Sequence, residues 1–263
     1  MDGGGGPQGQ VPSRRRRFRI ALWVLLGVLL ATVVAFVVWA SLAAPAEPGP
    51  LEDALADPAI EVTRGEVVEI SPAGVEPTQA VVFYPGARVD PEAYIATWAP
   101  IAAATDTRVL IPSMPLNLAF FGRDRATALR EEHPDIETWW VGGHSLGGAM
   151  AASYVGDQEP GTVDGLVLWA AYALESAGLS GRDDLTVLSV AGSRDGLSTP
   201  AEVAERRPFL PDAANMVEVE GMNHAQFGRY GPQAGDLEPT ISDEEATSRL
   251  LEAHLPVLIE GDL

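Results

Sequence analysis

The feature that most constrains the fold of this chain is the pentapeptide Gly143-His144-Ser145-Leu146-Gly147. It follows an apolar run at 138–141, which predicts a strand, and it opens an Ala-rich run at 146–155, which predicts a helix. Glycines on both sides of a serine permit a sharp strand-to-helix turn, because a residue without Cβ lets the chain pass close by. The serine Oγ then stands at the carboxyl end of a strand, above a helix N-terminus that stabilises negative charge. The pattern predicts an α/β fold with Ser145 as a nucleophile.

The rest of the sequence alternates between short strand patterns and helical patterns. Asp90 and Pro91 would begin the first helix as N-cap and first residue, and Pro100 predicts a kink or break within it. Short apolar strands that alternate with helices predict a mostly parallel sheet flanked by crossover helices. Strands are predicted at 67–70, 80–84, 107–111, 138–141, 165–170, 185–190 and 215–219, and helices at 91–105, 117–132, 146–155, 200–206 and 243–258.

His224 is the candidate general base. It follows the last predicted strand and precedes the closing helix, and a chain order of serine, acid, histidine accompanies this kind of turn. The chain has four histidines. His133 ends a predicted helix and His254 lies in the closing helix, so both are expected to be structural, and the side chain of His144 should point away from Ser145 Oγ.

Asp195 is the candidate acid that orients the imidazole. It lies in Ser193-Arg194-Asp195-Gly196, just after the strand predicted at 185–190. The alternative interpretation is an ordinary turn aspartate in an Asp-Gly pair. Asp164 is a rival, but it precedes a strand, so it should lie at the opposite edge of the sheet.

Two backbone N–H groups are candidate oxyanion donors. One belongs to Leu146, the residue after the serine. The other is expected in the loop after the strand at 80–84, which reads Tyr84-Pro85-Gly86-Ala87-Arg88, and Ala87 is the predicted donor.

With these places in this order, residues 60–260 resemble the α/β-hydrolase family, and look closest to its compact bacterial, dienelactone-hydrolase-like branch. The resemblance implies hydrolysis of an ester, thioester or amide through an acyl-enzyme on Ser145, with His224 as base and Asp195 as acid. Many members carry His-Gly in the oxyanion loop, where this chain has Pro85-Gly86. Dienelactone hydrolases proper use a cysteine nucleophile, which this chain lacks, so their substrate is not implied.

The N-terminal region predicts a membrane anchor. Residues 20–44 carry no charge, which is long enough to span a bilayer as a helix, and Trp23 and Trp39 lie near the two ends. Arginines before the segment and acidic residues after it predict a cytoplasmic N-terminus and an extracytoplasmic catalytic domain in the cell membrane. The alternative is a signal peptide cut near residues 40–44, which would release a secreted domain, but the apolar run exceeds the usual length of such signals.

Four regions are therefore expected along the chain. Residues 1–19 would form a disordered basic cytoplasmic tail, 20–44 a transmembrane signal anchor, 45–59 a stiff Pro/Ala-rich linker, and 60–263 the catalytic domain.

Composition excludes several kinds of chemistry. The formal net charge of −20 disfavours nucleic acid as a partner. All 17 basic residues are arginines, which excludes a lysine nucleophile, and the absence of cysteine excludes thiolate chemistry. The scattered histidines predict no metal site, and no cofactor is expected.

The predicted substrate pocket is open. Only 14 residues separate Ala170 from Leu185, which is too few for a cap domain. Two other inserts, 112–121 and 226–239, place candidate pocket residues near the site: Phe120, Phe121, Phe227 and Tyr230. A small-molecule or lipid-like ester is the expected partner. Two alternatives stay open at this stage, namely an acyltransferase on the same fold and a catalytically silent binding scaffold.

Overall fold

The computed structural model describes residues 14–259. The chain divides between Ser41 and Leu42 into two units. The first unit contains α1 (Arg14–Ser41), a continuous helix of 28 residues. It is the one helix in the described range that is long and apolar enough to cross a membrane. Residues 1–13 of the disordered tail expected at 1–19 lie outside the described residues. Residues 14–19 are helical as the first part of α1, so the prediction of disorder is wrong for them.

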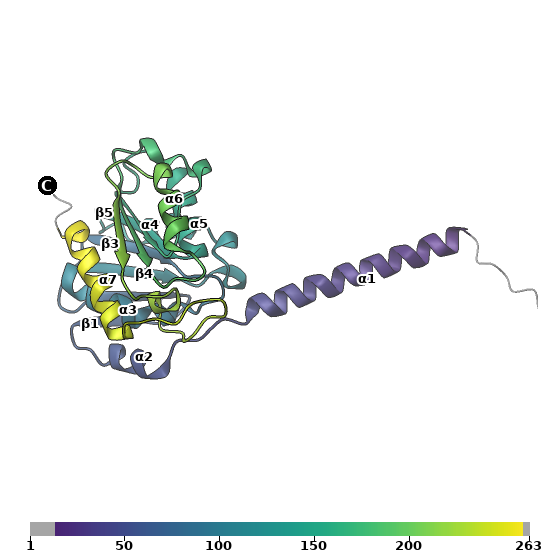
Figure 1. Ribbon diagram of the computed structural model, residues 1–263, viewed down its shortest axis with the longest axis horizontal. Helices are drawn as coiled ribbons and strands as arrows, with labels where there is room; N and C mark the ends of the chain where they lie inside the picture. Colours follow the sequence, from purple (N-terminus) through teal and green to yellow (C-terminus); the bar gives the residue numbers. More distant parts are fainter. Residues whose placement is uncertain (1–13, 260–263) are drawn as a thin grey trace, which may run out of the picture. The chain divides into compact units, whose positions relative to one another are not determined.

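The second unit is built on one eight-stranded sheet, with strand order β1-β2-β4-β3-β5-β6-β7-β8 (Figure 1). Strands β4, β3, β5, β6, β7 and β8 run parallel, and β2 is antiparallel to both of its neighbours. All seven predicted strands are confirmed, and β1 is an addition. The bounds are β1 (Ile60–Thr63), β2 (Val67–Pro72), β3 (Gln79–Tyr84), β4 (Thr107–Pro112), β5 (Thr138–His144), β6 (Gly165–Trp169), β7 (Thr186–Gly192) and β8 (Asn215–Val219).

Helices cover both faces of the sheet, as the alternating pattern predicts. One core contains buried side chains of α3 (Ile95–Thr105) and α7 (Asp243–Leu258), and the other contains those of α4 (Arg125–Glu132) and α5 (Leu146–Gly156). The parallel strands β3, β6 and β7 are almost entirely buried, which explains their near-continuous apolar sequences. Another helix of this unit, α6 (Pro200–Glu205), follows β7 and begins with a capping box made by Thr199 and Glu202.

The first crossover helix begins as predicted but breaks at a different place. Asp90 is its N-cap and accepts a hydrogen bond from Glu92 N–H. The change from 3-10 to α geometry falls between Tyr94 and Ile95, and Pro100 lies inside α3. The helix predicted at 117–132 begins only at Arg125. Asn117 has left-handed backbone angles, Leu118 is extended, and Ala119–Phe121 form a 3-10 turn that ends at a non-helical Gly122.

The segment expected to be a stiff spacer differs most from its sequence pattern. Residues Pro48–Leu55 form α2, and Leu51 and Ala54 pack against the core formed by α3 and α7. Proline at the start of a short helix is compatible with this structure, because the first N–H groups have no intrahelical acceptor. Ala44 also forms a parallel bridge with Val89. The folded unit therefore starts well before residue 60.

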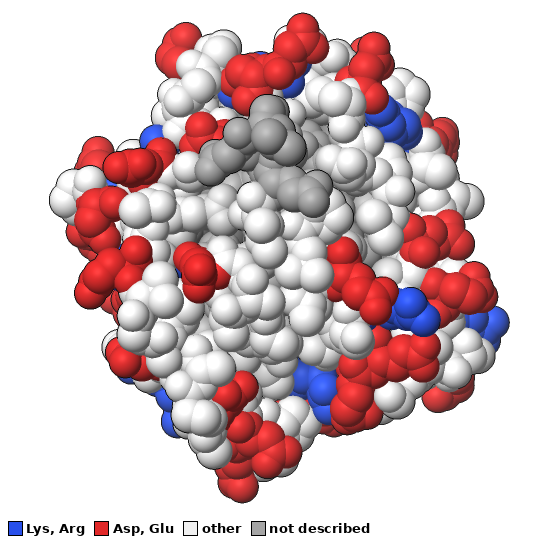
Figure 2. All heavy atoms as spheres, turned by 90° about the vertical axis from the view of Figure 1, so that its left-hand side faces the viewer, with Lys and Arg blue, Asp and Glu red and all other residues white. Residues whose placement is uncertain are grey.

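Acidic side chains predominate on the surface. On the face shown in Figure 2, Asp and Glu gather around the margin and Arg is sparse. This distribution fits the net charge of −20. Such a surface repels polyanions, in keeping with the expectation that nucleic acid is not a partner.

Candidate active site

Ser145 occupies a strained turn between β5 and α5. Its backbone angles are φ 53° and ψ −122°, and its N–H donates to Trp169 O at 2.9 Å. A side chain at Gly143 would place its Cβ 2.4 Å from the backbone of Gly147, and one at Gly147 would place its Cβ 2.1 Å from Tyr84 O. Neither overlap can be relieved by a side-chain movement, since both contacts are with backbone. The two glycines are thus what allow the turn to close against the end of β3.

Asp195 and His224 are joined by a buried hydrogen bond. Asp195 Oδ2 lies 2.8 Å from His224 Nδ1, and the two residues are 2% and 1% exposed. Asp195 Oδ1 accepts two further hydrogen bonds, from Leu197 N–H at 2.8 Å and Ser198 N–H at 2.7 Å. These two N–H groups fix the carboxylate, so that it holds the proton of His224 on Nδ1 and leaves Nε2 as the basic nitrogen. His224 Nε2 has no hydrogen bond within the described part of the chain.

The three residues follow parallel strands and so meet at one edge of the sheet, here called the carboxyl edge. Ser145 follows β5, Asp195 follows β7 and His224 follows β8. The ring of His144, the neighbour of Ser145, lies 4.5 Å from the ring of His224 between centroids. The Ser145 hydroxyl makes no hydrogen bond among residues 14–259, so it is not bonded to His224 in this structure.

Asp164, the rival acid, lies at the other edge. It precedes β6, and its carboxylate accepts a hydrogen bond from Trp139 N–H at 2.7 Å near the beginning of β5. The carboxylate thereby satisfies a backbone donor at the amino end of the sheet. The expectation that Asp164 faces away from the site is confirmed.

The loop of residues 84–88, here called the oxyanion loop, offers the expected backbone donor. Ala87 is exposed, and neither its N–H nor that of Leu146 has an acceptor among the described residues. The adjacent Gly86 is buried, and its N–H donates to the Tyr94 hydroxyl at 2.8 Å. Gly147 packs directly against Tyr84 O and Pro85 O, which brings the start of α5 to this loop. Both predicted donors, Leu146 N–H and Ala87 N–H, are thus unpaired among the described residues.

His144 links this loop to the base. The Tyr94 hydroxyl lies 2.9 Å from His144 Nδ1. Because this hydroxyl already accepts from Gly86, its own proton can be donated to His144 Nδ1, which requires a neutral ring. Burial, and secondarily repulsion from His224, holds the pKa of His144 well below its usual value. Burial also raises the pKa of Tyr94, so its hydroxyl keeps its proton.

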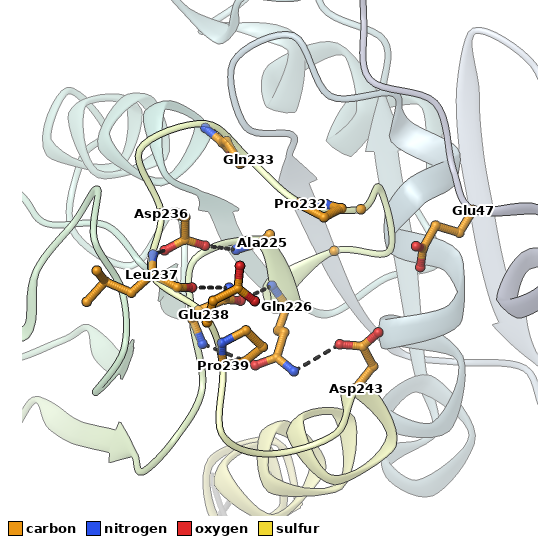
Figure 3. A pocket seen from close by; sticks show the side chains of 13 residues that line it. Glu47, Ala225, Gln226, Pro232, Gln233, Asp236, Leu237, Glu238, Pro239 and Asp243 are labelled. Carbon is orange, nitrogen blue, oxygen red and sulfur yellow. Dashed lines mark hydrogen bonds between the residues drawn. The ribbon is translucent and has the colours of Figure 1, made fainter.

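Asp236 connects the segment 220–242, here called the base loop, to the turn that carries Asp195. Its Oδ1 accepts from Gly196 N–H at 3.0 Å, and its Oδ2 accepts from Ala225 N–H at 3.0 Å. Gly196 follows Asp195 and Ala225 follows His224, so one carboxylate ties together the two turns that carry the acid and the base. Figure 3 shows this residue on the wall of a cavity of about 280 Å³ that lies beside the base loop.

The four candidate pocket residues occupy different environments. Phe120 and Phe121 are 67% and 48% exposed on the segment after β4. Phe227 is fully buried and packs against the rings of His144 and Trp169. Phe227 is therefore part of the core beneath the base, and its expected place in the wall of an open pocket is wrong. Tyr230 is half-buried, and its hydroxyl donates to Gln233 at 2.9 Å.

In the described part of the chain, the connection between β6 and β7 carries no cap domain. Residues 170–185, between β6 and β7, contain two 3-10 turns, Glu175–Ala177 and Leu179–Gly181. The expectation drawn from the short connection is confirmed. Among residues 14–259 there is no group of three or more His, Asp or Glu side chains that could hold a metal ion.

Sequence reasoning did not find Tyr94 or Asp236. Tyr94 ends a 3-10 turn ahead of α3, and Asp236 lies in an insert with no regular structure. Tyr94 joins Gly86 N–H to the side chain of His144, and Asp236 accepts from the N–H group of Gly196, 40 residues away. No local pattern marks such a residue.

The strained serine turn, followed along the chain by a hydrogen-bonded Asp–His pair at the same sheet edge, is the arrangement of an α/β-hydrolase. A family model described as the alpha/beta hydrolase family matches residues 80–248, a range that includes Ser145, Asp195 and His224. The chain belongs to the α/β-hydrolase family. No curated protein sequence matches it significantly.

Solved structures share this fold at low sequence identity. An esterase from Thermogutta terrifontis with bound propionate is 15% identical, with a TM-score of 0.57. The match covers 78% of this chain and 95% of the esterase chain. Est1E from Butyrivibrio proteoclasticus with bound ferulic acid is 12% identical, with a TM-score of 0.56 and coverages of 74% and 95%. A predicted CIB-like hydrolase from Thermoplasma acidophilum is 18% identical, with a TM-score of 0.52 and coverages of 73% and 95%. At these identities the likeness establishes the fold.

Proposed function

We propose that this protein is a membrane-anchored serine hydrolase that cleaves carboxylic esters through an acyl-enzyme on Ser145. The observation that carries the proposal is the buried 2.8 Å hydrogen bond between Asp195 and His224, at the sheet edge where Ser145 sits in a strained turn. Strained backbone at a serine is costly, and it persists where the surrounding structure enforces it for a purpose. In a serine hydrolase, the strained turn would present the Ser145 hydroxyl to the substrate.

In the proposed mechanism, His224 Nε2 removes the proton from Ser145 Oγ as this oxygen attacks the ester carbonyl. Asp195 stabilises the imidazolium that forms, because its carboxylate already accepts the Nδ1 proton. The N–H groups of Ala87 and Leu146 would bind the oxyanion. His224 then gives its proton to the departing alkoxide. A water molecule next attacks the carbonyl of the acyl-enzyme while His224 Nε2 takes a proton from it, and His224 returns that proton to Ser145 Oγ as the carboxylic acid leaves.

An ester is the substrate class that the available groups favour. The esterases that share the fold were solved with propionate and with ferulic acid, both of which are carboxylic acids. Acids are the acyl products of ester hydrolysis. The edge without a cap domain would admit substrates of varied length to Ser145.

The anchor part of the proposal rests on α1 and on the residues that follow it. The helix has the length and apolar composition of a membrane span, with arginines at its N-terminal end. Ala44 N–H donates to Arg88 O, and Ala44 O accepts from Asp90 N–H. A cut directly after Ala44 would remove a bonded residue from the fold, which supports retention of α1.

A direct test uses p-nitrophenyl esters of increasing acyl length and a fluorophosphonate probe on the full-length protein. The wild-type enzyme should hydrolyse the short esters and should carry the probe on Ser145. The Ser145→Ala variant should lose the label and about 10⁴-fold or more in kcat. Undiminished turnover in that variant would end the serine-hydrolase proposal. Release of the protein from membranes by alkaline carbonate would end the proposal of an anchor.

A further inference from the structure

The chain enters its catalytic unit at the oxyanion loop. Ala44 forms a parallel bridge with Val89, two residues beyond the proposed donor Ala87. Ala44 N–H donates to Arg88 O at 2.6 Å, and Asp90 N–H donates to Ala44 O at 2.9 Å. The guanidinium of Arg88 also donates to Leu42 O at 3.0 Å. Residues 42–44 are therefore fixed to the carboxyl edge of the sheet.

No free linker separates this fixed point from the apolar helix. Helix α1 ends at Ser41, and three residues of chain lead from there to Ala44. Even a fully extended chain covers only about 10 Å in three residues. A bilayer that α1 spans would then lie close to Ala44. The linker expected at 45–59 adds no reach, because it follows Ala44 in the chain and its residues Pro48–Leu55 are packed in the fold.

An exposed aromatic pair lies next to the same point. Arg88 N–H donates to Asn117 O at 2.8 Å, which joins the oxyanion loop to the segment that follows β4. That segment continues into Phe120 and Phe121, which are 67% and 48% exposed and contact each other edge to face. Neighbouring phenylalanines with this exposure are unfavourable in water, whereas the boundary between lipid headgroups and acyl chains accommodates them.

We infer that Phe120 and Phe121 dock the carboxyl edge on the bilayer surface, so that the sheet edge that carries Ser145 faces lipid. The inference rests on the proposed anchor, because the anchor places the bilayer at this edge. The net charge of −20 opposes docking on anionic lipid, so a zwitterionic surface is the partner that fits. Esters that reside in the membrane would then reach Ser145 without crossing bulk water.

The absence of cysteine allows a clean test on the full-length protein. A single cysteine at Phe120→Cys would carry an environment-sensitive fluorophore in phosphatidylcholine vesicles. The matched control is Val75→Cys, because Val75 is also an exposed apolar residue, at 42%, but lies at the amino edge beside Gln79 and Thr138. We expect blue-shifted emission from the label at 120 and at least twofold stronger quenching by nitroxide-bearing lipid than at 75. Equal emission and equal quenching at the two positions would overturn the docking inference.

Two further readouts on the same samples separate the possible failures. Flotation of the protein with the vesicles tests the anchor, and fluorophosphonate labelling of Ser145 tests the hydrolase. Flotation with equal quenching at 120 and 75 rejects docking and leaves the anchor intact. Protein that does not float rejects the anchor and docking together. Unlabelled Ser145 with stronger quenching at 120 supports docking and rejects only the hydrolase.

Discussion

The hydroxyl of Tyr94 lies 2.9 Å from Nδ1 of His144, and it also accepts the N–H of Gly86 at 2.8 Å. One phenol thus joins the oxyanion loop to the residue that precedes the nucleophile. All three groups are buried, so none of them can exchange its partner for water. The position of the oxyanion loop relative to the serine turn is set by this connection as well as by the contact at Gly147.

Replacing Tyr94 by phenylalanine should lower kcat more than it changes KM. The variant keeps the ring but leaves Gly86 N–H unsatisfied, and a lost buried hydrogen bond of roughly 1.4 kcal/mol corresponds to about tenfold in rate. Steady-state kinetics on a short ester measure the effect. The matched control is Tyr154→Phe, which removes a buried hydroxyl bonded to Thr127 on the opposite face of the sheet. An equal loss of kcat in both variants would show a general effect of destabilisation.

The variant Asp195→Asn should retain the fold and lose about 10⁴-fold in kcat, because an amide nitrogen facing His224 Nδ1 favours the wrong tautomer. The Oδ1 position can still accept from Leu197 and Ser198, so the loop should stay in place. Asp164→Asn is the control, since that carboxylate accepts from Trp139 at the opposite edge. Kinetics of the two variants, with circular dichroism for folding, decide the assignment. If Asp164→Asn were the inactive one, Asp195 would not be the acid.

Removal of the Asp236 carboxylate should loosen the acid and the base together. Asp236→Ala leaves the N–H groups of Gly196 and Ala225 without acceptors, and we expect about a tenfold fall in kcat from misplacement of His224. Glu238→Ala in the same loop is the control, because Glu238 is exposed. The pH dependence of kcat separates positioning from stability. A variant whose profile and kcat equal those of the wild type would show that the two turns hold their places unaided.

The stability of the catalytic unit should fall as the pH is lowered from about 6.5 to 4. His254 is buried between Trp169, whose Nε1–H donates to His254 Nε2 at 3.2 Å, and Leu250 O, which lies 2.7 Å from Nδ1. Burial lowers the pKa of His254 to about 4 from 6.5. Between these values the unfolded chain binds more protons than the folded one, so acid favours unfolding, with full stability retained above 6.5. The shift corresponds to roughly 3 kcal/mol near pH 4.

Thermal melting of the full-length protein between pH 7 and pH 4 measures this dependence. The His254→Gln variant should lose less stability over that range than the wild type does, because glutamine does not titrate there. His133→Gln, a half-buried histidine beside Arg108, should keep the steeper wild-type dependence. Parallel curves for the wild type and His254→Gln would refute the assignment of the pH dependence to His254.

The sequence predicts the three candidate catalytic residues of the site. It does not predict the residues whose hydrogen bonds connect the loops around them. The turn at Ser145 can be predicted because the glycines that it needs lie within two residues of the serine. Asp195 and His224 can be predicted because each follows a predicted strand, in the chain order serine, acid, histidine. Tyr94 contacts the side chain of His144 and Asp236 contacts the backbone of Gly196, and only the folded structure brings these partners together. The burial of Phe227 could not be read from its sequence neighbours either, because it depends on packing against His144.

The fold shows the same division between local and distant causes. Short apolar runs predict seven of the eight strands, because the composition of each run by itself indicates a buried strand. Helix α2 was missed because a Pro-rich sequence favours extended structure, and its helical form depends on Leu51 and Ala54 packing against the core. The late start of α4 follows from the non-helical backbone between Asn117 and Gly122, where a left-handed Asn117 and an extended Leu118 precede a 3-10 turn.

The pairing of Ala44 with Val89 sets a practical limit for anyone who wishes to produce the catalytic unit alone. Sequence composition suggests trimming at residue 60, where the first strand begins. That cut would strip a neighbour from the loop that carries Ala87 and would expose the core surface covered by α2. A truncated protein that keeps the catalytic unit folded should therefore begin no later than Leu42.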